Sequence, residues 1–221
     1  MRNLLTTILV LITTTVSAQP GDITTPHERA VIKMRDLRNW ATQDVLKLAL
    51  IRAEEVSASV DQLGVPEVDN IALEAANDWA QALGSRVVLT TDPNEADIVI
   101  VAHNVNNNQK TLAYCEIRWV GDTYRRVAVI HFNTNVRFTY GGGGEGAFDL
   151  QTVMTHELGH AFGTTHSRHN NDLMYPSGGP NTVKLLKTND TRRAIRNKAL
   201  WLSGIRWRPG YEPDDYIYPT K

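Results

Sequence analysis

The segment THELGHAFGTTHS constrains the fold of this 221-residue chain more than any other stretch. Residues four apart lie on the same face of a helix, so His156 and His160 can direct their imidazoles at one point, with Glu157 beside it. A straight helix cannot bring His166 to that point. Gly163 allows the chain to turn back, because glycine adopts left-handed backbone conformations without steric cost. The spacing therefore predicts a helix, a sharp turn and three converging histidines.

Three neutral imidazoles are a good ligand set for Zn²⁺, and they leave the fourth tetrahedral position open, which is typical of catalytic zinc sites. Bound zinc lowers the pKa of water and polarises a carbonyl oxygen. We therefore predict one catalytic zinc ion held by His156, His160 and His166, with Glu157 as the general base. The alternative, histidines without a metal, needs a chance match on the order of one in ten thousand, since the motif fixes five positions in eleven.

Apolar spacing predicts the elements around this motif. We expect strands at 86–90, 96–103, 111–119 and 125–133. We also expect a strand from about Val45, although a helix is an alternative for that segment. We expect one long helix within 63–84, with Pro66 in its first turn and Gly84 as its stop, a second at 148–162, and a last one, capped by Asn189 or Asp190, to about 202. This order predicts an α/β (α+β) fold, in which a twisted mixed sheet of about five strands carries two long helices above the cleft. A small irregular lower subdomain with the C-terminal helix completes it.

The N-terminus MRNLLTTILVLITTTVSAQP is typical of a secretory signal peptide. Arg2 precedes an apolar run from Leu4 to Val16, and small residues predict cleavage after Ala18. The run is short for a membrane span, so an uncleaved anchor is the less favoured alternative. We expect a secreted protein, extracellular or periplasmic. Its predicted parts are a signal peptide (1–18), an N-terminal extension or short pro-segment (19–44), a catalytic domain (45–203) and a C-terminal tail (204–221).

The charge balance limits which classes of partner are expected, and the cysteine count limits which disulfides can form. The chain has 23 basic and 24 acidic side chains and a net charge of −1, which gives no electrostatic argument for nucleic acid or a membrane surface. Cys115 is the one cysteine, so no intramolecular disulfide can form. We expect a monomer whose partners are protein or peptide substrates.

The motif HELGHAFGTTH, followed by Met174 in DLMYP, resembles the metzincin zinc endopeptidases. Ser167 and the triplet Met174-Tyr175-Pro176 are most similar to the matrixin (matrix metalloproteinase) branch, and the resemblance extends from roughly Val45 to Leu202. It implies that His156, His160 and His166 bind zinc, that Glu157 is the base and that Met174 forms the floor of the site.

The same resemblance implies where substrate binds. Leu112 and Ala113 match the edge-strand positions that receive an extended peptide through backbone hydrogen bonds. Tyr175 and Pro176 would lie near the pocket for the side chain just after the scissile bond.

The chain departs from the matrixin pattern at the structural metals. His131 occupies one position of the family's structural zinc site. Tyr114, however, stands where a histidine is expected, and the loop NVNNNQK lacks the expected aspartate. His103 and His131 would therefore form a partial site at most. The calcium-binding aspartates are replaced by Asn-Thr-Asn at 133–135. We therefore doubt a second zinc or a calcium ion. The family's latency cysteine is missing, and Asp22 or Asp36 could block the zinc instead.

Three functions remain open at this point. The leading one is a secreted zinc-dependent endopeptidase that cleaves extended segments of proteins. The second is a metzincin of another branch that acts on small peptides. The third is a catalytically silent zinc-binding decoy or adhesion module, for which a lost Glu157 or a broken ligand set is expected, and neither is seen.

Overall fold

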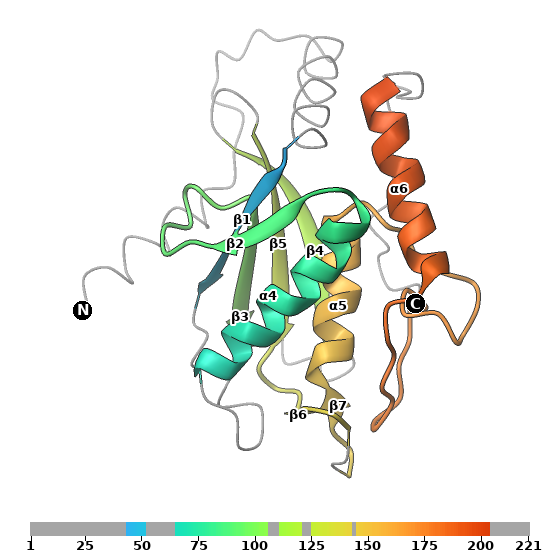
Figure 1. The fold of residues 1–221 in the computed structure, drawn as a ribbon. Helices are drawn as coiled ribbons and strands as arrows, with labels where there is room; N and C mark the ends of the chain where they lie inside the picture. Colours follow the sequence, from blue (N-terminus) through green and yellow to red (C-terminus); the bar gives the residue numbers. More distant parts are fainter. Residues whose placement is uncertain (1–42, 52–64, 106–110, 121–124, 143–144, 204–221) are drawn as a thin grey trace, which may run out of the picture.

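A five-stranded sheet with two helices across one face frames the domain (Figure 1). The computed structural model describes residues 43–51, 65–105, 111–120, 125–142 and 145–203. The strands of the sheet are β1 (Val45–Ile51), β2 (Arg86–Leu89), β3 (Ile98–His103), β4 (Ala113–Val120) and β5 (Arg125–Asn133). The helices are α4 (Val65–Ala82), α5 (Leu150–Ala161) and α6 (Thr188–Ser203). These elements confirm the predicted fold class, and the segment from Val45 is a strand.

Strand order leaves one antiparallel strand at an edge of the sheet. The order is β2-β1-β3-β5-β4, in which β1 pairs with β2 and β3 in parallel and β3 pairs with β5 in parallel. Strand β4 is antiparallel to β5, with Ala113 opposite Phe132. Since β5 is its one partner among the described strands, β4 has an outer backbone edge to which a strand can be added.

The main core fills the space between the sheet and helices α4 and α5. Alternate residues of β1, β3 and β5 point into it, as the two-residue period of a strand requires. Its largest member is Trp79 of α4, which is fully buried. The Trp79 indole Nε1 donates a hydrogen bond of 2.8 Å to the carbonyl oxygen of Thr155. This bond ties α4 to α5 immediately before His156.

Helix α5 begins two residues later than predicted, because Asp149 is its N-cap. The carboxylate accepts from the backbone N–H of Thr152 at 2.7 Å, while its second oxygen accepts from the N–H groups of Gly141 and Gly142 at 2.9 and 3.2 Å. Residues Phe148–Asp149 form a short strand, β7, which pairs with β6 (Phe138–Thr139) and was not predicted. Asp149 thus fixes both the start of the helix and the glycine-rich loop before it.

Replacing Asp149 by alanine is expected to lower the free energy of unfolding by about 0.5–2 kcal/mol, the usual cost of losing an N-cap. An asparagine at this position would keep one oxygen for Thr152 but present an amide NH₂ to the N–H groups of the glycine loop. Asp149→Asn should therefore fall between alanine and the parent. Urea unfolding followed by circular dichroism measures both. A midpoint for Asp149→Ala equal to that of the parent would contradict this role.

Helix α6 begins at Thr188, before the predicted cap at Asn189 or Asp190. The Asp190 side chain lies in the first turn and accepts from the N–H of Lys187 at 3.2 Å. It reaches back to the residue before the helix, as the third helical residue does in a capping box. None of the described helices has the length and apolar character that crossing a membrane requires.

Several predicted features lie outside the described residues. They are the signal peptide, most of the N-terminal extension with Asp22 and Asp36, and the C-terminal tail.

Candidate metal centre

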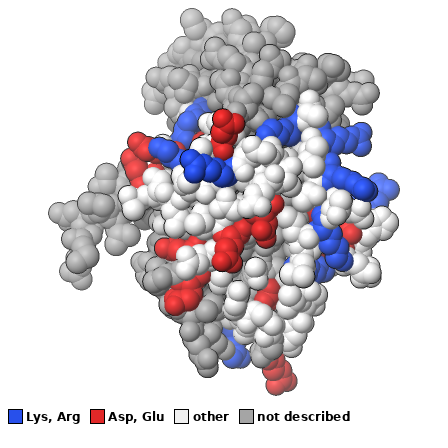
Figure 2. Space-filling model, viewed as in Figure 1, with Lys and Arg blue, Asp and Glu red and all other residues white. Residues whose placement is uncertain are grey.

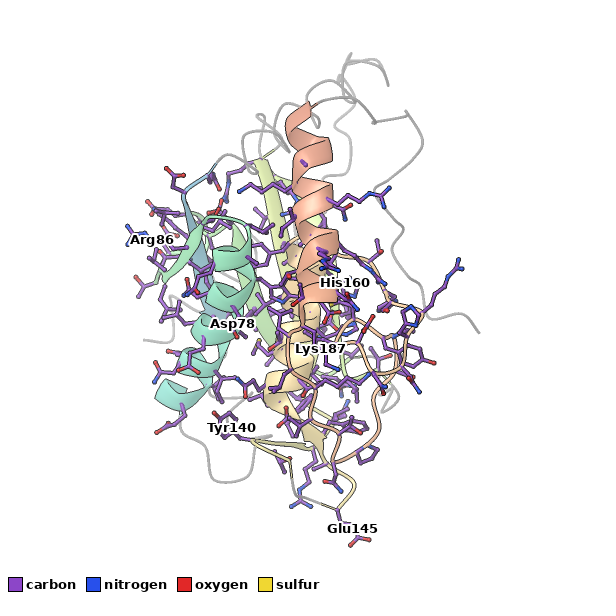
Figure 3. All side chains as sticks on the ribbon, turned by 45° about the vertical axis from the view of Figure 1, so that its right-hand side comes forward. Asp78, Arg86, Tyr140, Glu145, His160 and Lys187 are labelled. Carbon is purple, nitrogen blue, oxygen red and sulfur yellow. The ribbon has the colours of Figure 1, made fainter. Side chains whose placement is uncertain are left out.

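The structure brings His156, His160 and His166 together at one point. The first two lie on α5, and Gly163 turns the chain after the helix with φ of +81°, the conformation its sequence position predicts. The Nε2 atom of His166 lies 3.2 Å from the Nε2 atom of His156 and 3.2 Å from that of His160. Figure 3 labels His160, which lies in the last turn of α5.

Backbone carbonyls orient two of the three imidazoles. His156 Nδ1 lies 2.8 Å from the carbonyl oxygen of Leu173, and His160 Nδ1 lies 2.7 Å from that of Thr164. Because a carbonyl oxygen can only accept, both Nδ1 atoms carry the proton. In each neutral ring the Nε2 lone pair therefore faces the other histidines. Such a bond from the outer ring nitrogen is the usual support of a metal-binding histidine.

These nitrogens fit a zinc ion. Two lone pairs face His166 Nε2, which can donate to one of them at most, so hydrogen bonding alone leaves an acceptor unsatisfied. A cation satisfies all three nitrogens. Tetrahedral zinc with ordinary Zn–N distances holds its ligand nitrogens roughly 3.3–3.4 Å apart, close to the two spacings of 3.2 Å. Among the described residues, these three histidines are the group of potential ligands close enough to share one ion.

Burial keeps the histidines in the form that binds a metal. Burial first, and a neighbouring imidazole second, lower the pKa of His156 to about 3 and that of His160 to about 4. Burial also lowers the pKa of His166. A histidine must be deprotonated to donate a lone pair. The ligand set is therefore neutral at physiological pH.

Glu157 is a buried carboxyl group without a protein partner on one oxygen. Its side chain follows His156 on α5 and is 6% exposed, and within the described part of the chain Oε2 has no hydrogen-bond partner. Burial raises its pKa to about 8. A carboxyl group that titrates near neutral pH can both take up and release a proton during a reaction.

Met174 packs tightly beneath α5. It is fully buried, and its carbonyl oxygen accepts from the N–H of Ser167 at 2.6 Å, which joins its turn to the segment that carries His166. Gly159 allows this close approach. A Cβ atom at that position would lie 2.5 Å from the Met174 sulfur and 2.7 Å from Cζ2 of Trp79.

Replacing Gly159 by alanine is expected to destabilise the protein by about 1–3 kcal/mol, the usual cost of overpacking a core. Alanine is otherwise the better helix former by about 1 kcal/mol, so the sign of the effect is diagnostic. Thermal unfolding measures it. Gly178→Ala is the matched control, because a Cβ atom there meets nothing within 4 Å. An increase in stability for Gly159→Ala would rule out the close contact.

The four predicted substrate-contacting residues lie on two segments. Ala113 opens the edge strand β4, and Leu112 precedes it with a carbonyl oxygen that accepts from the N–H of Asn133 at 3.0 Å. Tyr175 and Pro176 follow Met174, the former half-buried and the latter exposed. The Lys184 ammonium lies 5.2 Å from the centre of the Tyr175 ring.

At the partial second metal site that the sequence resemblance implies, the side chains contact one another. His103 Nε2 lies 2.9 Å from Nδ1 of His131, and His131 Nε2 lies 3.4 Å from the Glu116 carboxylate. The Tyr114 ring stacks on His131 at 4.4 Å. The nearby His131 ring and then the hydrogen-bonding Arg118 guanidinium lower the pKa of Glu116 to about 2. Glu116 was not among the predicted residues of this cluster.

At the expected calcium position, the side chain of Asn133 forms hydrogen bonds with backbone groups. Its side-chain oxygen accepts from the N–H of Asn135 at 3.0 Å, and its amide donates to the carbonyl oxygen of Thr111 at 2.8 Å.

Sequence reasoning missed the contacts that α6 makes with the site. Arg193 donates to the carbonyl oxygen of His166 at 3.0 Å and to the hydroxyl of Ser167 at 3.1 Å. The Asn197 amide donates to the carbonyl oxygen of Gly163. The four-residue spacing of Arg193 and Asn197 places them on one helix face, but it does not say what that face contacts.

Comparison with known proteins agrees with this geometry. A family model described as Matrixin matches residues 39–197, well over half of the chain. Metalloendoproteinase 1-MMP of Arabidopsis thaliana is 47% identical over 49 residues, which are 22% of this chain and 14% of that protein. The aligned segment thus spans far less than two thirds of that relative's length.

Proposed function

Because this chain belongs to the matrixin family, we propose that it is a zinc-dependent endopeptidase that hydrolyses peptide bonds in extended segments of proteins. One observation carries the proposal. Three neutral imidazoles converge through their Nε2 atoms, and the residue after His156, Glu157, is a buried carboxyl group with one oxygen that has no partner among the described residues. A general base next to a three-histidine site is what the hydrolysis of an amide by water needs.

In the proposed mechanism His156, His160 and His166 hold the zinc ion. When bound, zinc makes water a stronger acid and the scissile carbonyl carbon a stronger electrophile. Glu157 takes a proton from water as the water oxygen bonds to that carbon. Glu157 then gives the proton to the departing nitrogen as the C–N bond breaks, which leaves a carboxylic acid and an amine. Burial raises the pKa of Glu157 in the metal-free protein, and a zinc ion held by the three histidines would favour the carboxylate form that accepts the proton.

The backbone of β4 would hold the substrate. An extended peptide that adds to this edge strand makes main-chain hydrogen bonds near Leu112 and Ala113, while pockets select alternate side chains. Tyr175 and Pro176 would line the pocket for the side chain after the scissile bond. The strand order supports this arrangement, since β4 lies at an edge of the sheet.

The test is zinc content measured together with cleavage of a mixed peptide library. We expect about one zinc ion per chain, as one three-histidine site implies. Cleavage should stop with a chelator and return when zinc is added back. Protein that binds zinc but cleaves no peptide under any condition would contradict the peptidase proposal. Protein that binds no zinc would contradict the metal centre itself.

We also propose that the protein is exported and that its signal peptide is removed after Ala18. The apolar run between Leu4 and Val16 and the small residues before Gln19 support this. The intact mass of protein recovered from the exported fraction measures the cleavage point. A mass that includes residues 1–18 would contradict it.

A further inference from the structure

We propose that α6 acts as a polar clamp on the third zinc ligand, with Arg193 and Asn197 as positioning residues. They hold the return loop, residues 163–167, in the shape that points His166 at the metal. The inference rests on the zinc centre of the proposed function. It concerns residues of a different helix, far along the chain from the ligands on α5.

His166 needs support that the other two ligands do not. His156 and His160 are held by α5 itself, and each has its Nδ1 atom bonded to a backbone carbonyl. The Nδ1 atom of His166 is buried and has no hydrogen-bond partner among the described residues. The position of this ring therefore depends on the backbone of the return loop.

Helix α6 holds that backbone at both ends. Asn197 donates to the carbonyl oxygen of Gly163, where the loop leaves α5. Arg193, one turn earlier on the same helix, donates to the carbonyl oxygen of His166 at 3.0 Å. Both bonds go to backbone oxygens, so they fix the path of the loop whatever its side chains are. They leave the imidazole of His166 free to bind.

Arg193 also joins the loop to the turn beneath the site. Its second guanidinium nitrogen donates to the Ser167 hydroxyl at 3.1 Å, and that hydroxyl donates to the buried Asp172 carboxylate at 2.5 Å. The planar fork of arginine can hold the two acceptors, His166 oxygen and Ser167 hydroxyl, at once. A lysine ammonium is a point charge and cannot reproduce that fork.

Over residues 188–199, the part of α6 whose side chains are described, the helix docks mainly through polar contacts. Among its described side chains Ala194 is the fully buried apolar residue, and Ile195 is 46% exposed. Arg192 and Arg196 are exposed, and Figure 2 shows Lys and Arg side chains gathered on the side where α6 lies in Figure 1. A helical segment that buries little apolar surface, as residues 188–199 do, opens locally at low cost. Because coupling between two sites is reciprocal, zinc binding should in turn stabilise the docked helix.

Zinc affinity of the full-length chain, measured by competition with a chromophoric chelator at one pH, tests the clamp. Arg193→Ala and Asn197→Ala should each weaken zinc binding by about 10- to 100-fold, the usual effect of removing a group that supports a metal ligand. Arg193→Lys should fall between Arg193→Ala and the parent. Arg196→Ala is the matched control and should bind zinc as the parent does. Circular dichroism of each metal-free variant identifies any that fails to fold.

Hydrogen exchange gives a readout that a purely structural role would not change. In the parent, zinc should slow amide exchange in α5 and also in α6. In Arg193→Ala, saturating zinc should slow α5 but no longer α6. Parental zinc affinity in Arg193→Ala and Asn197→Ala, with α6 still protected by zinc, would overturn the clamp.

The same measurements separate this inference from the proposed function. If the affinities change as expected but no peptide is cleaved, the clamp stands and the peptidase proposal fails. If the parent takes up no zinc, both fail.

Discussion

Replacing Glu157 by glutamine lowers kcat/KM for peptide cleavage by about 10²- to 10⁴-fold, the usual contribution of a general acid–base group. Glutamine has nearly the same shape but cannot take the proton from water. The three histidines are untouched, so zinc content should stay at the parental value. Kinetics on the best peptide of the library, together with metal analysis, measure both quantities.

The matched control for this variant is Glu74→Gln, on the exposed side of α4. It should leave both kcat/KM and zinc content unchanged. If Glu157→Gln cleaves as fast as the parent, Glu157 is not the base. If neither the parent nor the variant cleaves any peptide while both bind zinc, the silent zinc-binding module becomes the better explanation.

The same substitution should stabilise the metal-free protein. Burial raises the pKa of Glu157 to about 8 from an ordinary value of 4.5, so the folded state binds a proton more tightly than the unfolded state. Its ionisation therefore costs stability as the pH rises above 4.5, and the cost is fully developed near pH 8. Glutamine does not ionise, so the substitution removes this cost. In chelator at pH 8, Glu157→Gln should be more stable than the parent by a few kcal/mol, and at pH 4 the two should be alike.

Thermal unfolding in chelator across this pH range measures the difference. Glu116→Gln is the informative comparison, because hydrogen bonds lower the pKa of Glu116 and favour its ionised form. Stability from that group is present above its unfolded pKa and is lost as the pH falls toward 2. Glu116→Gln should therefore destabilise the protein at pH 8. A stability gap for Glu157→Gln that is equal at pH 4 and pH 8 would show that its carboxyl group is not buried as described.

Local geometry explains what could be predicted from the sequence. The convergence of His156 and His160 follows from helical spacing, and the left-handed conformation of Gly163 follows from the need to turn. The strand at Val45 follows from alternating leucines. Each of these depends on residues within one turn or one strand.

Contacts between residues far apart in the sequence explain the features that could not be predicted from it. Helix α5 starts at Leu150 because Asp149 caps it, and the second oxygen of Asp149 accepts from the amides of Gly141 and Gly142, a contact that no helical or strand spacing predicts. The order of the parallel strands depends on crossovers that the strand sequences do not encode. The Arg193 bond to His166 spans 27 positions, and no spacing rule reaches that far.

The bond between Arg193 and His166 also has a consequence for the order in which the protein is made. A ribosome delivers the chain from the N-terminus, and domains fold as they emerge. All three imidazoles precede Arg193 and Asn197, so a nascent chain exposes its metal ligands before it carries the helix that steadies the last of them. Tight metal loading would thus belong to finished chains, and chains truncated before Thr188 should release zinc readily.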